Sequence, residues 1–345
     1  MNDYEKHWHD LNVSLNEIEN RDGDLRTVFT ALQAHQLETG FIRDDLEAVE
    51  RFEFCHPKIR ERCLRIQFNP SRATRSQGAG ILSPPPRVSE HHDGCFLCPA
   101  NIRWQQQGRQ FGYELDINGQ SFIAWMNPFP LMPGHIVLAS KSHLGQEWSL
   151  HPSGTLDPQQ IVADLIELVA RAPGYAGFYN GVDAGASIPE HLHYQLFKSP
   201  ADKRRFPLEI VARAARNARP GQPGWRLDKY PVESMHWYGE PRDIIEQSSR
   251  WIGQWVAHQQ CLPDLTANIL AISEEQSAKV ALFFVPRDRR KSRASGLSGQ
   301  VGGLEVLGEL VYSTPEEQHK LESGELNYFS LEQVLAEVRT SLNMP

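Results

Sequence analysis

Residues 185–197 read GASIPEHLHYQLF, and this stretch decides how the rest of the chain is interpreted. Side chains of a β-strand alternate between its two faces, so a strand over 191–197 sorts its residues into two sets. One set is polar and the other apolar: His191, His193 and Gln195 against Leu192, Tyr194 and Leu196. Two imidazoles and a carboxamide in a row are costly to bury without partners. The pattern therefore favours a functional strand over the alternative, an edge strand with polar side chains in solvent.

The turn before this strand has the composition of an anion-binding turn. Gly185, Ala186 and Ser187 are small, so backbone N–H groups in this turn can approach a negatively charged group closely. We therefore expect the polar face of the strand to lie beside a bound anion.

Two of the five cysteines have the spacing of a metal knuckle. Cys95 and Cys98 are separated by two residues. A redox pair and two unconnected buried thiols are the alternatives, but no strand-to-helix thioredoxin pattern surrounds them. Five cysteines are also too few and too oddly numbered for a disulfide framework, and a reducing compartment favours metal binding. The other three are Cys55, Cys63 and Cys261.

Composition excludes several classes of protein. The 345 residues carry a formal net charge of −8, so binding to nucleic acid through released counterions is not expected. No run approaches the roughly 18 apolar residues of a membrane span. The sequence from Met1 to Lys6 lacks the basic and then apolar pattern of a signal peptide. We expect a cytoplasmic protein.

The order of predicted elements indicates an α+β chain. Asp157 as N-cap and Pro158 at the first helical position predict a helix that ends at Pro173. Strands are predicted on both sides of it, at 121–125, 136–140, 177–180 and 191–197. A second helix is predicted at 244–257, with strands at 267–272, 280–285 and 304–312. Strands followed by a helix, twice, indicate two related halves.

The turn and strand at 185–195 resemble the active-site strand of one branch of the histidine-triad superfamily. This branch contains galactose-1-phosphate uridylyltransferases, diadenosine tetraphosphate phosphorylases and GDP-galactose phosphorylases, and it carries His-x-His-x-Gln. The resemblance implies a histidine-triad fold with two related halves of antiparallel sheet and packed helices. It also implies that His193 is the nucleophile, that Gln195 holds a phosphate oxygen, and that Ser187 contacts phosphate. A neutral imidazole is a competent nucleophile near neutral pH.

The run from Cys95 to Arg103 resembles the zinc knuckle of the uridylyltransferases. Those enzymes complete a tetrahedral site with two histidines, so the resemblance implies a structural zinc site built from Cys95, Cys98, His143 and His191. His135 is the rival third ligand, and the pair His91 and His92 also competes.

Further segments between residues 65 and 198 resemble an uncharacterised bacterial domain family of the same branch. The shared features are Gln67 to Pro70, Arg72, the knuckle, the Asn127 to Pro130 run and the longer spacing from Ser187 to His191. Asn127 is a candidate for base or ribose contact, with an Asn that starts a turn as the alternative. Arg287 and Lys291 resemble a phosphate-contacting segment of the phosphorylases, with a solvated basic loop as the alternative.

These resemblances divide the chain into three predicted segments. They are a helical N-terminal segment at 1–64, a catalytic half with the knuckle at 65–200, and a second histidine-triad-like half at 201–345.

The implied function is transfer of a nucleoside monophosphate group from a nucleoside diphosphate sugar or a dinucleoside polyphosphate. The acceptor would be phosphate or a sugar phosphate, and the intermediate covalent. A nucleotide hydrolase and a non-catalytic nucleotide-binding protein are the alternatives. The expected partners are the nucleotide substrate and phosphate, with no nucleic acid and no membrane. Dimers are frequent in this branch, so a homodimer is one candidate assembly.

Overall fold

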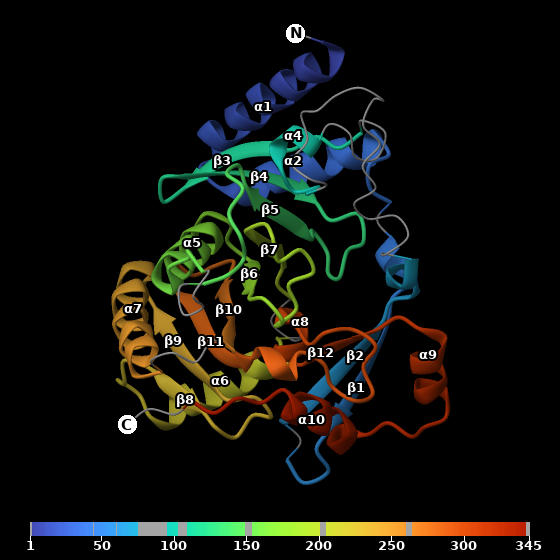
Figure 1. Cartoon of the computed structure of the whole chain (residues 1–345), viewed down its shortest axis with the longest axis vertical. Helices are drawn as coiled ribbons and strands as arrows, with labels where there is room; N and C mark the ends of the chain where they lie inside the picture. Colours follow the sequence, from blue (N-terminus) through green and yellow to red (C-terminus); the bar gives the residue numbers. More distant parts are fainter. Residues whose placement is uncertain are drawn as a thin grey trace.

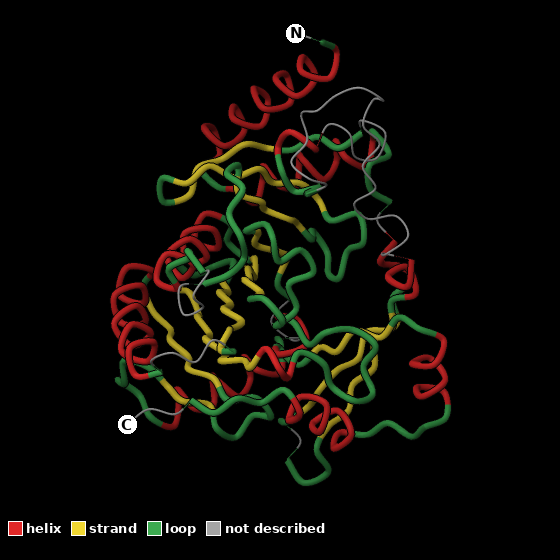
Figure 2. Tube along the Cα trace, in the orientation of Figure 1, coloured by secondary structure: helices red, strands yellow, loops and turns green. Residues whose placement is uncertain are grey.

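The computed structural model describes residues 2–43, 45–59, 61–74, 95–102, 109–148, 154–200, 205–259 and 264–342. A nine-stranded sheet runs through the middle of the molecule, and a smaller three-stranded sheet lies beside it (Figure 1, Figure 2). In spatial order the large sheet consists of β3 (Tyr113–Ile117), β4 (Gln120–Met126), β5 (Ile136–Ser140), β7 (His193–Lys198), β6 (Tyr175–Asn180), β10 (Leu265–Ser273), β11 (Val280–Asp288), β9 (Ser234–Gly239) and β8 (Trp225–Leu227).

The large sheet contains two arrangements of the same kind. In the first, β4, β5, α5 (Pro158–Arg171), β6 and β7 follow one another along the chain; in the second, β8, β9, α7 (Pro241–His258), β10 and β11 do so. Their spatial orders are β4-β5-β7-β6 and β8-β9-β11-β10. The two arrangements meet where β6 pairs antiparallel with β10. The predicted α+β class with two related halves is confirmed.

The helix predicted after Asp157 forms as α5. The Asp157 side chain accepts a hydrogen bond from the Gln159 N–H, and Pro158 occupies the first turn. Its apolar stripe is buried, and α5 packs beside α7 along one face of the sheet (Figure 1). The Gln160 amide donates to Asp164 one turn further along the same helix (2.7 Å).

Two further helices cover the edge of the sheet near β3 and β4. They are α1 (Asp3–Asp22) and α2 (Leu25–Glu38). Both contribute side chains to the core that contains α5 and α7, among them Leu15, Val28 and Phe29.

The opposite face of the large sheet packs against a second core. This core includes the three-stranded sheet of β1 (Glu50–Cys55), β2 (Cys63–Phe68) and β12 (Glu309–Tyr312), in which β12 runs parallel to β2. Helices α6 (Pro207–Ala218), α8 (Gly303–Val306), α9 (Pro315–Glu322) and α10 (Tyr328–Glu337) surround it, and short helical segments occur at α4 (Pro99–Ile102), η1 (Asp45–Ala48), η2 (Pro70–Thr74) and η5 (Arg289–Lys291). Within 304–312, where a strand was predicted, α8 comes first and only the last four residues form β12.

Pairing crosses both predicted segment boundaries. β1 pairs with β2 across residue 64, and β6 pairs with β10 across residue 200, so neither residue separates one sheet from another. The N-terminal segment also contains β1, which the expectation of a helical segment did not include. The three-segment division stays a prediction.

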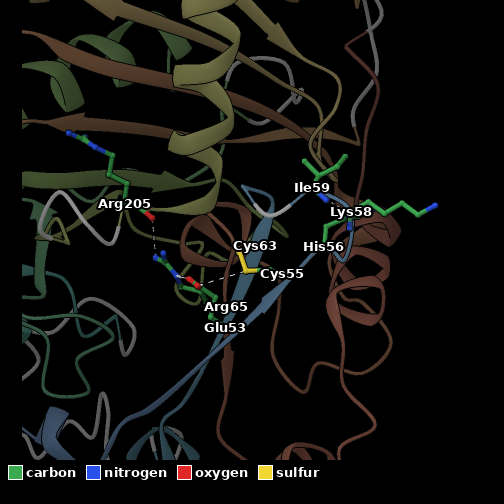
Figure 3. Close-up of a disulfide and its surroundings, with 8 residues drawn as sticks. All are labelled: Glu53, Cys55, His56, Lys58, Ile59, Cys63, Arg65 and Arg205. Carbon is green, nitrogen blue, oxygen red and sulfur yellow. Dashed lines mark hydrogen bonds and ion pairs between the residues drawn. A yellow bond between two sulfur atoms is a disulfide. The ribbon is translucent and has the colours of Figure 1, made fainter.

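The β1–β2 hairpin carries a disulfide between Cys55 and Cys63, shown in Figure 3. The cysteine count gave no reason to expect it. The two residues lie directly opposite in the hairpin register, which brings their side chains together. An ion pair between Arg65 and Glu53 lies beside it (2.8 Å).

Among the described residues, no helix combines the length and apolar character that a membrane span requires.

Candidate active site

A cavity of about 830 Å³ lies over the face of the large sheet that carries His193 and Gln195. Its floor is a row of four directly paired residues on β4, β5, β7 and β6: Trp125, Val137, Gln195 and Phe178. The alternation predicted from the sequence explains this floor. Tyr194 and Leu196 belong to the core on the other side of the sheet, which leaves Gln195 facing the cavity.

Two glycine-containing turns, one from each half, meet at the cavity wall. Gly185 has a left-handed φ of 99°, and a Cβ there would lie 2.4 Å from the Gly302 Cα. The Asn180 Oδ1 accepts a hydrogen bond from the Gly303 N–H (2.8 Å), which ties the second turn to β6. Glycine is required at 185 because the two backbones are in contact.

His193 is almost fully buried and lines the cavity. Its Nδ1 lies 2.9 Å from the carbonyl oxygen of His191. A carbonyl can only accept, so Nδ1 carries the proton and Nε2 is the basic nitrogen of the neutral ring. This is the protonation state that a histidine nucleophile requires.

Gln146 holds the backbone of His193 in place. Pairing between β6 and β7 ends at Phe178 and Gln195, and beyond that point the Gln146 carboxamide bridges the two strands. Its Oε1 accepts from the His193 N–H (2.9 Å), and its Nε2 donates to the carbonyls of His193 (3.0 Å) and Asn180 (2.9 Å). The Gln146 side chain therefore takes the place of a peptide group in the hydrogen-bond ladder. No motif in the sequence predicted this role for Gln146.

The four predicted metal ligands lie together. One donor atom from each of Cys95, Cys98, His143 and His191 falls within 4.8 Å of all the others. The Cys98 Sγ is 3.0 Å from the His143 Nδ1, and the Cys95 Sγ is 3.4 Å from the His191 Nδ1. His135 is outside this group, and His91 and His92 lie outside the described residues.

The chemistry of the donor set fits a divalent cation. The His191 Nε2 is 2.8 Å from the Ser140 carbonyl, so Nε2 carries the proton and Nδ1 turns its lone pair toward the thiols. Burial lowers the pKa of His191, which keeps the ring neutral. Burial, and then the neighbouring Cys95, raise the pKa of Cys98 to about 12. Two thiolates would therefore need a cation between them. A set of two sulfur and two nitrogen donors, all buried except the exposed His143, suits Zn²⁺.

Three of the predicted substrate residues line the cavity: Ser187, Asn127 and Arg72. The Asn127 Oδ1 accepts from the Phe129 N–H (2.9 Å), the turn geometry that was its alternative interpretation. Arg72 donates to the Phe129 carbonyl (2.7 Å). Among the described residues that line the cavity, Arg72 is the only arginine or lysine.

Arg287 and Lys291 do not line the cavity. Arg287 is fully buried behind it, where Nη1 donates to Asn268 Oδ1 and to the Val301 carbonyl (both 2.7 Å). Asn268 in turn donates to Asn180 (2.8 Å), so Arg287 supports the two turns from behind. Lys291 is exposed on η5 and donates to the Arg339 carbonyl (3.3 Å). The expectation of direct phosphate contact is not supported at either position.

Gln110 and Glu305 are two of the cavity residues to which no pattern in the sequence pointed. Gln110 is buried, and its Nε2 has no hydrogen-bond partner, so an acceptor on a ligand would satisfy it. Glu305 follows the Gly302–Gly303 turn, and burial raises the pKa of its carboxyl. Neither lies in a motif that could have revealed it.

His135 contacts the predicted catalytic strand rather than the metal-ligand group. Its Nε2 lies 2.8 Å from Gln195 Oε1. His135 directly precedes β5, and no pattern in the sequence indicated its partner.

The fold of this chain is also found in phosphorylases of known structure. The chain has the fold of the yeast Ap4A phosphorylase in complex with AMP, with a TM-score of 0.55, 15% identity, and 99% of this chain and 98% of that chain covered. With the same enzyme in complex with Ap4A the TM-score is 0.56 at 14% identity, covering 92% and 98%. An ADP-glucose phosphorylase from Arabidopsis thaliana also matches at 15% identity, covering 85% and 100%, but its TM-score of 0.33 supports no argument.

The fold is therefore the one seen in the yeast Ap4A phosphorylase, an enzyme of the kind whose active-site strand the sequence resembles. Residues 31–198, from within α2 to the end of β7, match a family described as Domain of unknown function (DUF4922). No curated protein matches the sequence.

Proposed function

We propose that the protein is a nucleotidyltransferase of the phosphorylase type. It moves a nucleoside monophosphate group from a nucleoside diphosphate sugar or a dinucleoside polyphosphate to phosphate or a sugar phosphate. The observation that carries the proposal is the hydrogen bond from His193 Nδ1–H to the His191 carbonyl, which directs a basic Nε2 to the reaction.

In the first step, His193 Nε2 attacks the phosphorus of the nucleoside monophosphate group. A P–N bond forms, the P–O bond to the leaving phosphate breaks, and the electron pair departs with that phosphate. The imidazole becomes cationic while Nδ1–H stays on the His191 carbonyl, which stabilises the positive charge. In the second step, an oxygen of the acceptor phosphate attacks the same phosphorus, the P–N bond breaks and the ring returns to its neutral state.

The leaving group is already acidic, so it needs positioning and charge neutralisation more than a general acid. Arg72 supplies positive charge at the cavity wall, and Gln195 offers amide donors from its floor. We infer that the two cysteines and two histidines of the metal-ligand group hold one structural Zn²⁺, which ties the knuckle to the strand that carries His193. Cys95, Cys98, His143 and His191 are its proposed ligands.

The yeast enzyme of the same fold binds AMP and Ap4A, so Ap4A is the first substrate to test. The protein should be incubated with Ap4A, or with nucleoside diphosphate sugars, in the presence of phosphate. Intact-mass spectrometry should then show one nucleoside monophosphate on the wild type and none on His193→Ala. Turnover by His193→Ala should fall by roughly 10⁴-fold or more.

The matched control is His258→Ala, at the end of α7 on the opposite side of the sheet, which should retain the adduct. An adduct that persists on His193→Ala would contradict the assignment. Nucleoside monophosphate as the sole product at millimolar phosphate would make water the acceptor and replace this proposal with a hydrolase. Binding without turnover across the whole panel would indicate a non-catalytic nucleotide-binding protein.

A further inference from the structure

His135 is a buried histidine whose two ring nitrogens both have partners. It is 1% exposed and lies between the Gly134 turn and β5. Its Nδ1 is 3.0 Å from the backbone nitrogen of Leu131, and its Nε2 is 2.8 Å from Gln195 Oε1. The first contact lies in the loop that lines the cavity, and the second lies on the cavity floor.

These contacts determine the tautomer of the ring. The Leu131 N–H can only donate, so the His135 Nδ1 must accept. A neutral imidazole then carries its proton on Nε2, and that N–H donates to Gln195. The atom of Gln195 that faces His135 is therefore the carbonyl oxygen, and its NH₂ group points the other way.

The orientation of Gln195 matters because its two amide ends have opposite effects on a phosphate. Within the described part of the chain, the Gln195 NH₂ makes no hydrogen bond, and the residue lines the cavity between Val137 and Phe178. Turned toward a phosphate chain, the NH₂ group donates to an anionic oxygen. Rotated by half a turn, the carboxamide would present its own oxygen and repel the phosphate.

We propose that His135 is a positioning residue that fixes Gln195 with its amide donors toward the phosphate undergoing transfer. The inference rests on the proposed function. His135 also connects the loop at 128–131, which borders the cavity, to the catalytic strand. The ring therefore sets the position of the loop and the orientation of the carboxamide together.

Two substitutions separate the two contacts. In His135→Asn the shorter side chain places an oxygen near the former Nδ1, where it can accept from Leu131 but falls short of Gln195. In His135→Gln the longer side chain places an NH₂ near the former Nε2, where it can donate to Gln195. With Ap4A and phosphate, kcat of the Asn variant should fall by about 10²-fold, the effect of losing one oriented donor in the transition state. The Gln variant should stay within about tenfold of the wild type.

Metal content and thermal midpoint serve as controls, because a purely structural role would lower stability and activity together in both variants. An Asn variant as active as the wild type would overturn the proposal, and so would equal losses in the two variants. The split between kcat and KM is a further readout. Losing the orientation of Gln195 should change kcat more than the KM for Ap4A, since the lost interaction strengthens as charge develops.

A second measurement does not depend on turnover. Selective ¹⁵N labelling of histidine should show the His135 ring as the Nε2–H tautomer at neutral pH, and an Nδ1–H ring would overturn the assignment. If the wild type transfers nothing from Ap4A or ADP-glucose, the proposed function fails and the catalytic part of this inference fails with it. The tautomer measurement would then still report whether the hydrogen-bonded arrangement exists, so the two failures are distinguishable.

Discussion

Residues around the cavity differ in whether they line it or lie behind its wall, and the two arginines illustrate the difference. Arg72 lines the cavity, whereas Arg287 is buried behind it with Asn268 and Val301 as partners. Burial lowers the pKa of Arg287 to about 10, although Glu305 opposes this. We expect a guanidinium in that position to support the turns, and phosphate contact by Arg287 stays a prediction.

Substitution of the two arginines should therefore change different quantities, the KM for phosphate at Arg72 and the stability at Arg287. Arg72→Ala should raise the KM for phosphate with little loss of stability, because a cavity-lining cation is lost. Arg287→Met keeps the buried volume but leaves Asn268 and the Val301 carbonyl without a donor, which costs about 1–3 kcal/mol for each group. Phosphate-dependent kinetics and urea unfolding of both variants check this expectation. A raised KM for phosphate in Arg287→Met without loss of stability would contradict this expectation and indicate that Arg287 binds phosphate.

At the scale of structural elements, the knuckle before α4 is connected to the catalytic strand through the metal-ligand group. Cys95 and Cys98 come from the knuckle, His143 follows β5, and His191 precedes β7. The His191 carbonyl also accepts from His193, so the same residue would connect the proposed metal site to the proposed nucleophile. Loss of a bound ion should therefore displace His193, because the His191 backbone carbonyl holds its ring.

We expect wild-type protein purified without added metal to contain one zinc per chain. Cys98→Ser should lower the metal content and also the thermal midpoint, by about 2–4 °C for each kcal/mol lost. Cys63→Ser is the control, because it removes a sulfur outside the metal-ligand group. Glu53, Cys55 and Cys63 form a second set of possible ligands, but both thiols are used in the disulfide, so metal content should not change. Elemental analysis and a thermal melt provide the measurements. A fully stable wild type without metal would refute the zinc site.

Another element-scale prediction concerns β9. His236 is buried between Trp225 and Phe283, and burial lowers its pKa to about 3. The unfolded chain binds a proton near pH 6.5 and the folded chain does not, so stability falls as the pH drops below 6.5. Between pH 7 and pH 5 this one group should remove about 2 kcal/mol of unfolding free energy. Urea unfolding at the two pH values should show a smaller decrease for His236→Phe than for the wild type, and equal decreases would contradict the assignment.

For the molecule as a whole, the two halves share one sheet and meet at the cavity. β6 pairs with β10 in the sheet, and Gly185 contacts Gly302 above it. Both cores contain residues from before and after position 200. The halves should therefore unfold as one unit and not in sequence.

The contact between the turns can be tested at Gly185. Gly185→Ala places a Cβ in a left-handed backbone and against the Gly302 Cα, which should cost about 2–4 kcal/mol. Gly221→Ala is the control, because its backbone is also left-handed but nothing lies within 4 Å of the added Cβ. Its cost should be only about 1–2 kcal/mol. Circular dichroism and tryptophan fluorescence should report one coincident urea transition in each protein, and two separate transitions would show that the halves are independent.

Local patterns in the sequence were sufficient to predict the features that depend on residues close together along the chain. Alternation placed His193 and Gln195 on one face, capping residues marked α5, and the order of elements indicated two related halves. The resemblance of short motifs also brought together four metal-ligand candidates that now lie within 4.8 Å of one another. Each of these depends on backbone periodicity or on a motif shorter than about ten residues.

Tertiary structure alone decided which residues share a cavity and which support it from behind. Gln146 is 47 residues from His193 in sequence, and His135 is 60 residues from Gln195, yet each pair is joined by a hydrogen bond. Arg287 belongs to a basic run that suggested phosphate binding, but pairing of β10 with β11 turned its side chain into the interior. The Cys55–Cys63 disulfide likewise depends on the register of a hairpin that composition could not reveal. Strand register and burial are set by the packing of distant segments, so the partners of a polar side chain cannot be read from its own neighbourhood in the sequence.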